Sequence, residues 1–338
     1  MLKNPWFWVS VGLAGLLIII QLGGGSSRIA APDTPSIAFL VGDAGPYWKR
    51  VIRGAEEAAT KYGAEIDVIV PEEGGEDQTR RLLTIDADKY DGVAISPLRP
   101  EEQSRTISVL ATRTKVVTFD NDAPESVRHC HVGTNNYVAG TVCGELMAEA
   151  LPEGGKIAIF VGDHERENAI LRRQGLVDKL SGVTRTPGAN LDPIDEPIEA
   201  GKYTVVATYL DGSVRKNAEE NVRRALQEHP DLDGMAALYG YNGPVCLEAL
   251  QEADKLGEIK LVAFDEEEKL LEGIEAGHAY GAVVQAPFQY GYEAIRILVE
   301  LAQNETAVPY ASRGVVYLPC QSVTAENIDE FRSMLETE

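Results

Sequence analysis

A short pattern that occurs twice constrains this chain more than any other feature. Residues 116–120 read V-V-T-F-D and residues 261–265 read L-V-A-F-D, so each apolar run stops at a carboxylate. Such a run is typical of a strand that is buried on both faces of a parallel sheet. Ligands of open α/β sheets bind beyond the carboxyl ends of the strands, which makes Asp120 and Asp265 candidate ligand residues.

A second pair of segments supports an internal duplication. Residues 37–43 read I-A-F-L-V-G-D and residues 157–163 read I-A-I-F-V-G-D. In each half of the chain, this strand comes first and the strand ending in F-D comes later. Chance similarity between βα units is the alternative explanation. The ordered recurrence favours two similar α/β domains that face each other across a cleft.

Length and charge restrict the class of protein. A chain of 338 residues allows two ordinary domains, and its 44% hydrophobic content is that of a globular protein. The net charge of −22 argues against binding to nucleic acid or to an anionic membrane surface, because both need a basic patch.

The N-terminal segment is not expected to be part of the fold. Lys3 precedes an apolar run over residues 5–22, which is either a signal peptide or a membrane anchor, and we favour an uncleaved anchor. Both readings predict a periplasmic or extracytoplasmic protein, the second one tethered to the inner membrane. Residues 23–35 form a flexible linker. Residues 22–24 resemble the start of a lipoprotein box, but Gly25 stands where a lipidated cysteine is needed.

The cysteines predict neither a metal site nor a redox site. No C-x-x-C spacing occurs among the four, so we expect no metal and no cofactor. The apolar neighbours of Cys143 and Cys246 favour buried free thiols over disulfides. The four cysteines are Cys130, Cys143, Cys246 and Cys320.

Strands and helices are predicted to alternate along the rest of the chain, which indicates doubly wound parallel sheets. Three segments should cross between the domains, after residues 134, 285 and 312. The first domain then comprises residues 36–134 plus 286–312, and the second comprises residues 135–285 plus 313–338. Residues 187–201 show no periodicity and are expected to form a long loop. The last strand (314–318) and the last helix (324–335, with Thr324 as its N-cap) are assigned to the second domain.

Two aromatic residues follow the first strand. Tyr47 and Trp48 stand at the start of a predicted helix whose N-terminus points at the cleft. They belong either to the core or to the ligand site. Their position just after a strand-end loop favours the ligand site.

These motifs together resemble the type I periplasmic sugar-binding proteins of the ribose- and galactose-binding class. The resemblance covers residues 36–335 and implies two doubly wound domains joined by three crossovers, which trap a sugar by hinge closure. It implies eight ligand-binding residues and no catalytic residue. They are Tyr47 and Trp48 in P-Y-W, Asp120 and the adjacent Asn121, Arg172 in N-A-x-x-R-x-x-G, Asn242, Asp265, and Gln285 in Q-A-P.

The chemistry of this set suits a polyhydroxylated ligand. Aspartates accept from hydroxyls, arginine donates in a planar fork, and asparagine and glutamine do both. The chain departs from the family at Asn121, where the ribose-binding pattern has Arg, and at Gly45, which replaces a polar side chain. These departures leave open which sugar or polyol is bound.

The resemblance implies a monomeric binding protein that delivers its ligand to an ABC permease. A membrane-tethered sensor for a chemoreceptor or kinase is the alternative, since a tether suits both. An enzyme acting on glycosides is less favoured, because binding alone accounts for Asp120 and Asp265. A transcription factor of this fold needs a basic helix-turn-helix at the N-terminus, where this chain has an apolar segment.

Overall fold

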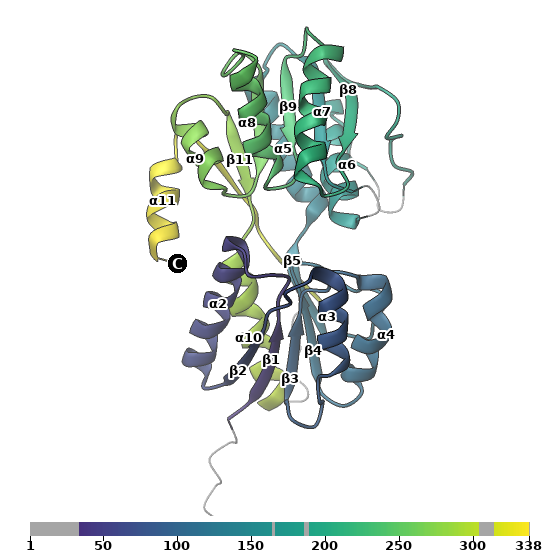
Figure 1. Cartoon of the computed structure of the whole chain (residues 1–338), viewed down its shortest axis with the longest axis vertical. Helices are drawn as coiled ribbons and strands as arrows, with labels where there is room; N and C mark the ends of the chain where they lie inside the picture. The colour runs from purple at the N-terminus through teal and green to yellow at the C-terminus, as the bar shows by residue number, and fades with distance from the viewer. Residues whose placement is uncertain (1–33, 164–165, 186–188, 304–313, 338) are drawn as a thin grey trace, which may run out of the picture. The chain divides into compact units, whose positions relative to one another are not determined.

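The chain folds into two β-sheets, each covered by helices on both faces (Figure 1). The computed structural model describes residues 34–163, 166–185, 189–303 and 314–337. The first sheet contains β1 (Ser36–Leu40), β2 (Glu65–Ile69), β3 (Gly92–Ile95), β4 (Lys115–Phe119), β5 (Cys130–Thr134) and β12 (Val315–Leu318). Its strand order is β12-β5-β4-β3-β1-β2, and all its strands are parallel.

The second sheet repeats this architecture with an antiparallel strand at each edge. Its strands are β6 (Gly155–Val161), β7 (Ile198–Ala200), β8 (Tyr203–Leu210), β9 (Gly234–Ala237), β10 (Lys260–Phe264), β11 (Gly281–Val284) and β13 (Gln321–Thr324). They are ordered β13-β11-β10-β9-β6-β8-β7. The parallel centre agrees with the predicted fold class, and β7 and β13 are the two antiparallel additions.

Helices pack on both faces of each sheet. In the first lobe, α2 (Pro46–Tyr62) and α10 (Pro287–Gln303) cover one face, and α3 (Gly74–Leu83) and α4 (Pro100–Ala111) cover the other. In the second lobe, one face carries α5 (Asn136–Ala150) and α6 (Glu167–Ser181). The opposite face carries α7 (Arg215–Glu228), α8 (Asn242–Glu252), α9 (Glu268–Glu275) and α11 (Ile328–Thr337).

The central strands bury both of their faces. In β10, Leu261 and Ala263 pack into one core cluster, while Val262 and Phe264 pack into the cluster on the other side. Side chains alternate across a strand, so a strand between two helical layers has to be apolar at every position. The uninterrupted apolar runs of the sequence have this cause.

Each lobe contains one pair of helices in very close contact, which supports the predicted duplication. A Cβ atom on Gly54 of α2 would lie 1.9 Å from the carbonyl oxygen of Phe288 in α10. A Cβ atom on Gly175 of α6 would lie 2.1 Å from the carbonyl oxygen of Tyr137 in α5. In each lobe, the helix that follows the first strand (α2 or α6) therefore packs against the helix that directly follows a crossing from the other lobe (α10 or α5), and glycine permits the close approach.

The third crossing lies further along the chain than expected. The first two occur between β5 and α5 and between β11 and α10, close to the predicted positions. The strand at 315–318, however, pairs with β5 in the first sheet, so the boundary at residue 313 is wrong, and the chain crosses at residues 319–320. A four-residue edge strand carries no pattern that indicates which sheet it joins.

The short segments near the edges of the second sheet also differ from the expectation. The loop expected at 187–201 contains β7, which pairs with β8. The last helix begins at Ile328 rather than at residue 324, because residues 321–324 form β13 and Thr324 ends that strand. Asn135 is the N-cap of α5, since its side chain accepts a hydrogen bond from the backbone N–H of Val138 at 3.1 Å.

Three of the four cysteines are buried, and all four are free thiols, as expected. The predicted anchor at residues 1–22 lies outside the described residues, as does most of the linker at 23–35. Within the described ranges, we find no helix with the length and apolar character needed to cross a bilayer.

Candidate ligand-binding site

The two repeated carboxylates occupy equivalent backbone positions in the two lobes. Asp120 follows β4 with φ 59°, and Asp265 follows β10 with φ 62°. Left-handed backbone is uncommon outside glycine, although aspartate tolerates it better than most residues. In each case the backbone N–H donates to the neighbouring strand at 2.9 Å, to Val132 O and to Val283 O respectively. The backbone thus turns sharply after β4 and after β10, and each turn places a carboxylate at the carboxyl edge of its sheet.

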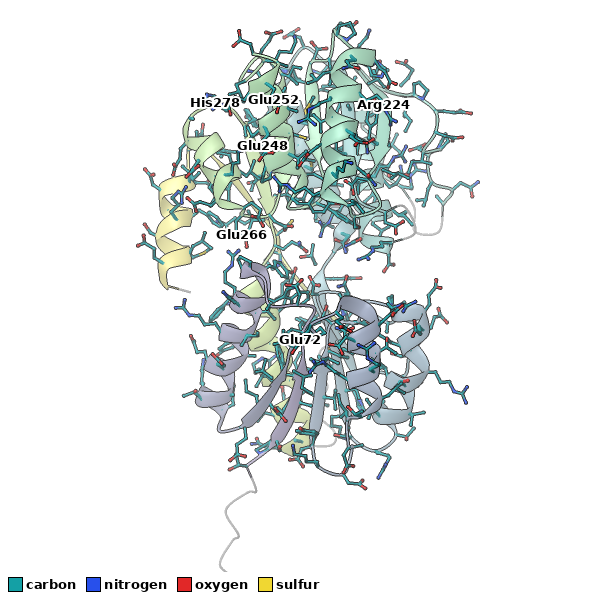
Figure 2. All side chains as sticks on the ribbon, in the orientation of Figure 1. Glu72, Arg224, Glu248, Glu252, Glu266 and His278 are labelled. Atoms are coloured by element: carbon teal, nitrogen blue, oxygen red, sulfur yellow. The ribbon has the colours of Figure 1, made fainter. Side chains whose placement is uncertain are left out.

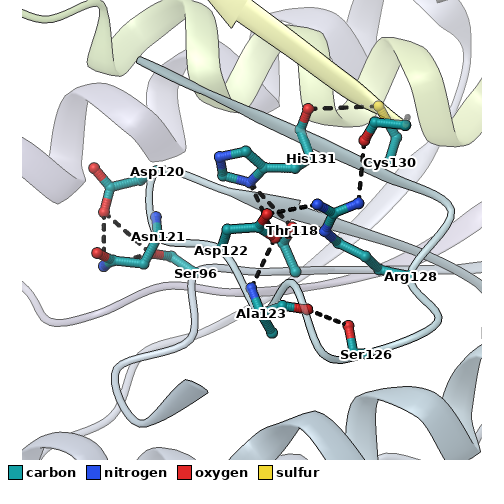
Figure 3. A network of polar contacts seen from close by, with 11 residues as sticks. Ser96, Thr118, Asp120, Asn121, Asp122, Ala123, Ser126, Arg128, Cys130 and His131 are labelled. Carbon is teal, nitrogen blue, oxygen red and sulfur yellow. Dashed lines mark hydrogen bonds and ion pairs between the residues drawn. The ribbon is translucent and has the colours of Figure 1, made fainter. Parts of the chain in front are cut away.

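Asp120 is held by three side-chain donors. The hydroxyl of Tyr47 donates to Oδ1 at 2.5 Å. Oδ2 accepts from Ser96 Oγ at 3.1 Å and from Asn121 Nδ2 at 2.9 Å (Figure 3). Desolvation raises the pKa of Asp120, against the lowering effects of the Tyr47 and Ser96 hydrogen bonds and of the Arg172 charge. The carboxylate is therefore fixed in orientation before any ligand arrives.

A partly buried ion pair fixes the loop that carries Asp120 and Asn121. The carboxylate of Asp122 pairs with the guanidinium of Arg128 and accepts from Thr118 Oγ1 at 2.8 Å (Figure 3). Burial alone would raise the pKa of Asp122, but the Arg128 hydrogen bonds and the neighbouring His131 lower it. Burial lowers the pKa of His131 to about 4, so this imidazole is neutral near pH 7.

The two aromatic residues have different surroundings. Tyr47 is half-buried, and its hydroxyl reaches Asp120 as described above. Trp48 is only 7% exposed and packs in the core of the first lobe, edge-on to Phe119 with a centroid separation of 6.4 Å. Its indole N–H donates to Asp43 at 3.0 Å, and a Cβ atom on Gly42 would lie 2.3 Å from its ring. Trp48 therefore has the environment of the core alternative, whereas the Tyr47 hydroxyl lies beside Asp120.

On the second lobe, Asp265 is bound to the segment that crosses back to the first lobe. Gln285 donates from Nε2 to Asp265 Oδ1 at 2.8 Å. The hydroxyl of Tyr290 lies 3.4 Å from Gln285 Oε1 and also hydrogen-bonds with Thr134 at the end of β5. Tyr290 is fully buried. Through these two hydrogen bonds its hydroxyl connects two of the three segments that cross between the lobes.

Arg172 is positioned by the close packing of α5 and α6. Its Nε donates to Asn136 Oδ1 and its Nη1 donates to Leu238 O, both at 2.9 Å. Its guanidinium carbon lies 4.5 Å from the centroid of the Phe264 ring. The side chain is only 4% exposed, yet its charge lowers the pKa of Asp120 in the other lobe. Arg172 therefore acts on the same region as the two carboxylates.

Asn242 begins α8 and is 1% exposed. Its Nδ2 donates to Asp211 Oδ2 at 2.8 Å. Its Oδ1 is buried and accepts no hydrogen bond from the part of the chain that the structure describes. Asn242 thus presents a single unused acceptor.

Sequence reasoning missed three residues that organise this region. Ser96 and Asp211 each follow a strand directly, so the rule that selected Asp120 and Asp265 also applies to them. Tyr290 lies inside a helix, and no sequence pattern indicates that its hydroxyl joins two crossing segments. The described residues contain no group of three or more His, Cys, Asp or Glu side chains that is able to hold a metal ion.

The arrangement combines charged acceptors, a planar cation and amides. Carboxylates at the edge of each sheet accept hydrogen bonds, and Arg172 donates them. Such a set matches a neutral molecule with several hydroxyl groups, each of which is both donor and acceptor.

Comparison with known proteins agrees with this geometry. Residues 37–306 match the family described as "Periplasmic binding protein domain". The D-allose-binding periplasmic protein of Escherichia coli K12 is 22% identical over 311 residues, which covers 88% of this chain and 92% of that protein.

Solved structures share the fold. An ABC transporter solute-binding protein from Burkholderia graminis, crystallised with D-arabinose, is 26% identical with a TM-score of 0.76 and covers 89% of this chain and 98% of its own. The XylFII–LytSN complex contains a chain that is 21% identical with a TM-score of 0.71, covering 87% of this chain and 99% of its own.

Proposed function

Because this chain belongs to the periplasmic binding protein domain family, we propose that it is an extracytoplasmic solute-binding protein for a small sugar or polyol. In this proposal the ligand binds between the two lobes, hinge closure traps it, and the closed protein delivers it to an ABC permease. The names of its relatives, a D-allose-binding protein and a solute-binding protein crystallised with D-arabinose, support a monosaccharide as the ligand.

The observation that carries the proposal is the pairing of Asp120 and Asp265. Each lobe presents one left-handed aspartate at the carboxyl edge of its sheet, and both charges raise the pKa of Tyr47 together with its burial. A ligand that donates hydroxyls to both carboxylates gains its full set of contacts only when the lobes close. It therefore binds the closed state better, and this difference in affinity shifts the population.

The number of charged contacts is sufficient for tight binding. A hydrogen bond to a charged group contributes roughly 1.5–3 kcal/mol. One such bond to each of Asp120, Asp265 and Arg172 contributes roughly 4.5–9 kcal/mol in total, and the upper end of this range reaches the about 8 kcal/mol that corresponds to a Kd of 1 μM. Amide groups of Asn121, Asn242 and Gln285 add to this in our proposal.

A binding screen tests the proposal. Thermal shift followed by calorimetry with D-ribose, D-allose, D-arabinose, D-xylose, D-galactose and myo-inositol should identify at least one that raises the melting temperature. Asp120→Asn and Asp265→Asn should each weaken its binding by about tenfold or more. Asp254→Asn is the matched control, because Asp254 has φ 55° but is exposed and follows α8. Equal affinity of all three variants would exclude the proposed site.

Small-angle scattering tests the closure. The wild-type protein should become more compact when it is saturated with the sugar found in the screen. Asp120→Asn should lose this compaction at the same sugar concentration. Binding without compaction of the wild type would contradict the hinge mechanism, even if the sugar specificity is as proposed.

A sensory role is the second candidate. Similarity to the XylFII–LytSN complex and the apolar segment at residues 5–22 support a membrane-tethered protein that reports its ligand to a sensor. Co-purification with a permease favours transport, and co-purification with a sensor kinase favours signalling. Incubation with aryl glycosides should give no turnover, since the family is a solute-binding class.

The proposed location is the extracytoplasmic side of the inner membrane, with the protein acting as a monomer. The apolar run at residues 5–22 supports export of the chain that follows it. Proteolysis of spheroplasts should degrade the protein while the inner membrane is intact. Protection from the protease under those conditions would contradict the proposed location.

A further inference from the structure

Asp211, a buried carboxylate that is not among the predicted ligand residues, is hydrogen-bonded to Asn242. Asp211 follows β8 and is only 2% exposed. Its Oδ1 accepts from the Tyr241 hydroxyl at 2.5 Å and from the Ser213 N–H at 2.8 Å. Its Oδ2 accepts from Asn242 Nδ2 at 2.8 Å. Asp211 is therefore surrounded by donors and has a single orientation.

This carboxylate determines which end of the Asn242 amide faces it. An ionised carboxylate only accepts hydrogen bonds, so the NH₂ group of Asn242 has to point at Asp211 and the oxygen has to point away. A flipped amide would place two oxygens against each other. The orientation of Asn242 is thus set by its chemical partner.

The side-chain oxygen of Asn242, which points away from Asp211, has no hydrogen-bond partner in the part of the chain that the structure describes. Asn242 Oδ1 is buried, and none of the described residues donates to it. Buried polar atoms are nearly always hydrogen-bonded, because an unpaired buried acceptor costs free energy. The unpaired oxygen of Asn242 at the start of α8 therefore requires a hydrogen-bond donor that the described residues do not supply.

The position of Asn242 identifies the region from which that donor comes. Its backbone N–H donates to Tyr239 O at 2.9 Å, immediately after Leu238, whose carbonyl accepts from Arg172. Asn242 and Arg172 therefore meet the same strand end, at the carboxyl edge of the second sheet. The proposed ligand lies at that edge.

We infer that Asp211 is a positioning residue that fixes Asn242 as an obligate acceptor for a hydroxyl group of the ligand. This inference rests on the proposed function and makes it more specific. Without Asp211, an asparagine presents either its oxygen or its NH₂ group. With Asp211, the site requires a ligand group that donates at this point, and it discriminates against a sugar in which that hydroxyl is replaced by fluorine or hydrogen.

The first test compares two changes at the same carboxylate. Asp211→Asn removes the acceptor that orients Asn242, so it should weaken binding of the tightest ligand among D-ribose, D-allose and D-arabinose at least tenfold. Tyr241→Phe removes a different donor from Asp211 and leaves Asn242 in place, so it should change the affinity by less than threefold. Equal affinity of Asp211→Asn and the wild type would overturn the inference.

A double-variant cycle separates positioning from a general structural role. In an Asn242→Leu background, Asp211→Asn should cause no further loss of affinity, because the residue through which it acts is absent. Losses that add in the double variant would contradict positioning and assign Asp211 a structural role alone.

A second measurement needs no change at Asp211 and applies if Asp211→Asn does not fold. The monofluorinated derivatives of the same sugar keep an acceptor at each position but lose the donor. At one ring position, the fluorinated sugar should bind the wild type at least tenfold more weakly, and Asn242→Leu should bind both sugars equally. Equal binding of all fluorinated derivatives to the wild type would overturn the inference. If none of the six compounds in the binding screen binds the wild type, the proposed function fails together with this inference.

Discussion

Replacing Glu266 with glutamine should make the protein more stable at alkaline pH, because Glu266 is a nearly completely buried acid. Its side chain (labelled in Figure 2) is 1% exposed and forms an ion pair with Arg50 of α2, which belongs to the first lobe. Neither carboxylate oxygen has a hydrogen-bond partner of normal geometry among the described residues, so the charge of Arg50 is the main interaction that favours the ionised form. Burial, helped by the charges of Asp265 and Glu267, raises the pKa of Glu266 to about 8 against the opposing charge of Arg50.

The sign follows from counting protons. The unfolded chain releases the Glu266 proton near its ordinary pKa of 4.5, whereas the folded chain keeps it until about pH 8. Between these values the folded state binds more protons, so the stability from this group is complete below pH 4.5 and is lost as pH rises to 8. At about 1.4 kcal/mol per pKa unit, the full loss is on the order of 5 kcal/mol.

Urea unfolding from pH 5 to pH 9, followed by circular dichroism, measures this effect. The free energy of unfolding of Glu266→Gln minus that of the wild type should be near zero at pH 5 and should rise by several kcal/mol by pH 8. Glu267→Gln removes the neighbouring charge at an exposed position and is the control. Arg50→Gln should extend the pH-dependent loss of stability to higher pH than in the wild type, since it removes the charge that opposes protonation of Glu266. A difference that is constant from pH 5 to pH 9 would refute the reasoning.

Three further predictions concern the core, the thiols and the site. Trp48→Ala should lower the free energy of unfolding by about 3–5 kcal/mol, because it empties a core position, and a loss below 1 kcal/mol in urea unfolding would argue against the packing described. Cys143 and Cys246, whose pKa values burial raises well above the usual range, should react with iodoacetamide only after unfolding, as mass spectrometry can detect. The melting temperature should not change with reductant, and a decrease would indicate a disulfide. Arg172→Lys should weaken sugar binding at least tenfold in calorimetry, since a lysine cannot make both fork contacts and stack on Phe264; retained affinity would count against a ligand contact.

Much of the fold was readable because burial on both faces leaves a strong signal in sequence. The central strands are apolar at every position, and the helices follow with an amphipathic period, so their order predicted two doubly wound sheets. Edge strands have no such signal. β12 is half-buried and short, and only its hydrogen bonds to β5 assign it to the first sheet.

The chemistry at the strand ends divides in the same way. That Asp120 and Asp265 end equivalent strands was determined by the sequence alone, because an apolar run followed by a carboxylate is a local pattern. The burial of Trp48 was decided by tertiary structure. Its ring packs against Phe119, which is distant in the sequence, and Gly42 has no side chain that would clash with the ring. The orientation of the Asn242 amide was also decided there, because it depends on a carboxylate 31 residues away. Hydrogen-bond partners of this kind are set by the packing of separate strands, and no periodicity along the chain encodes them.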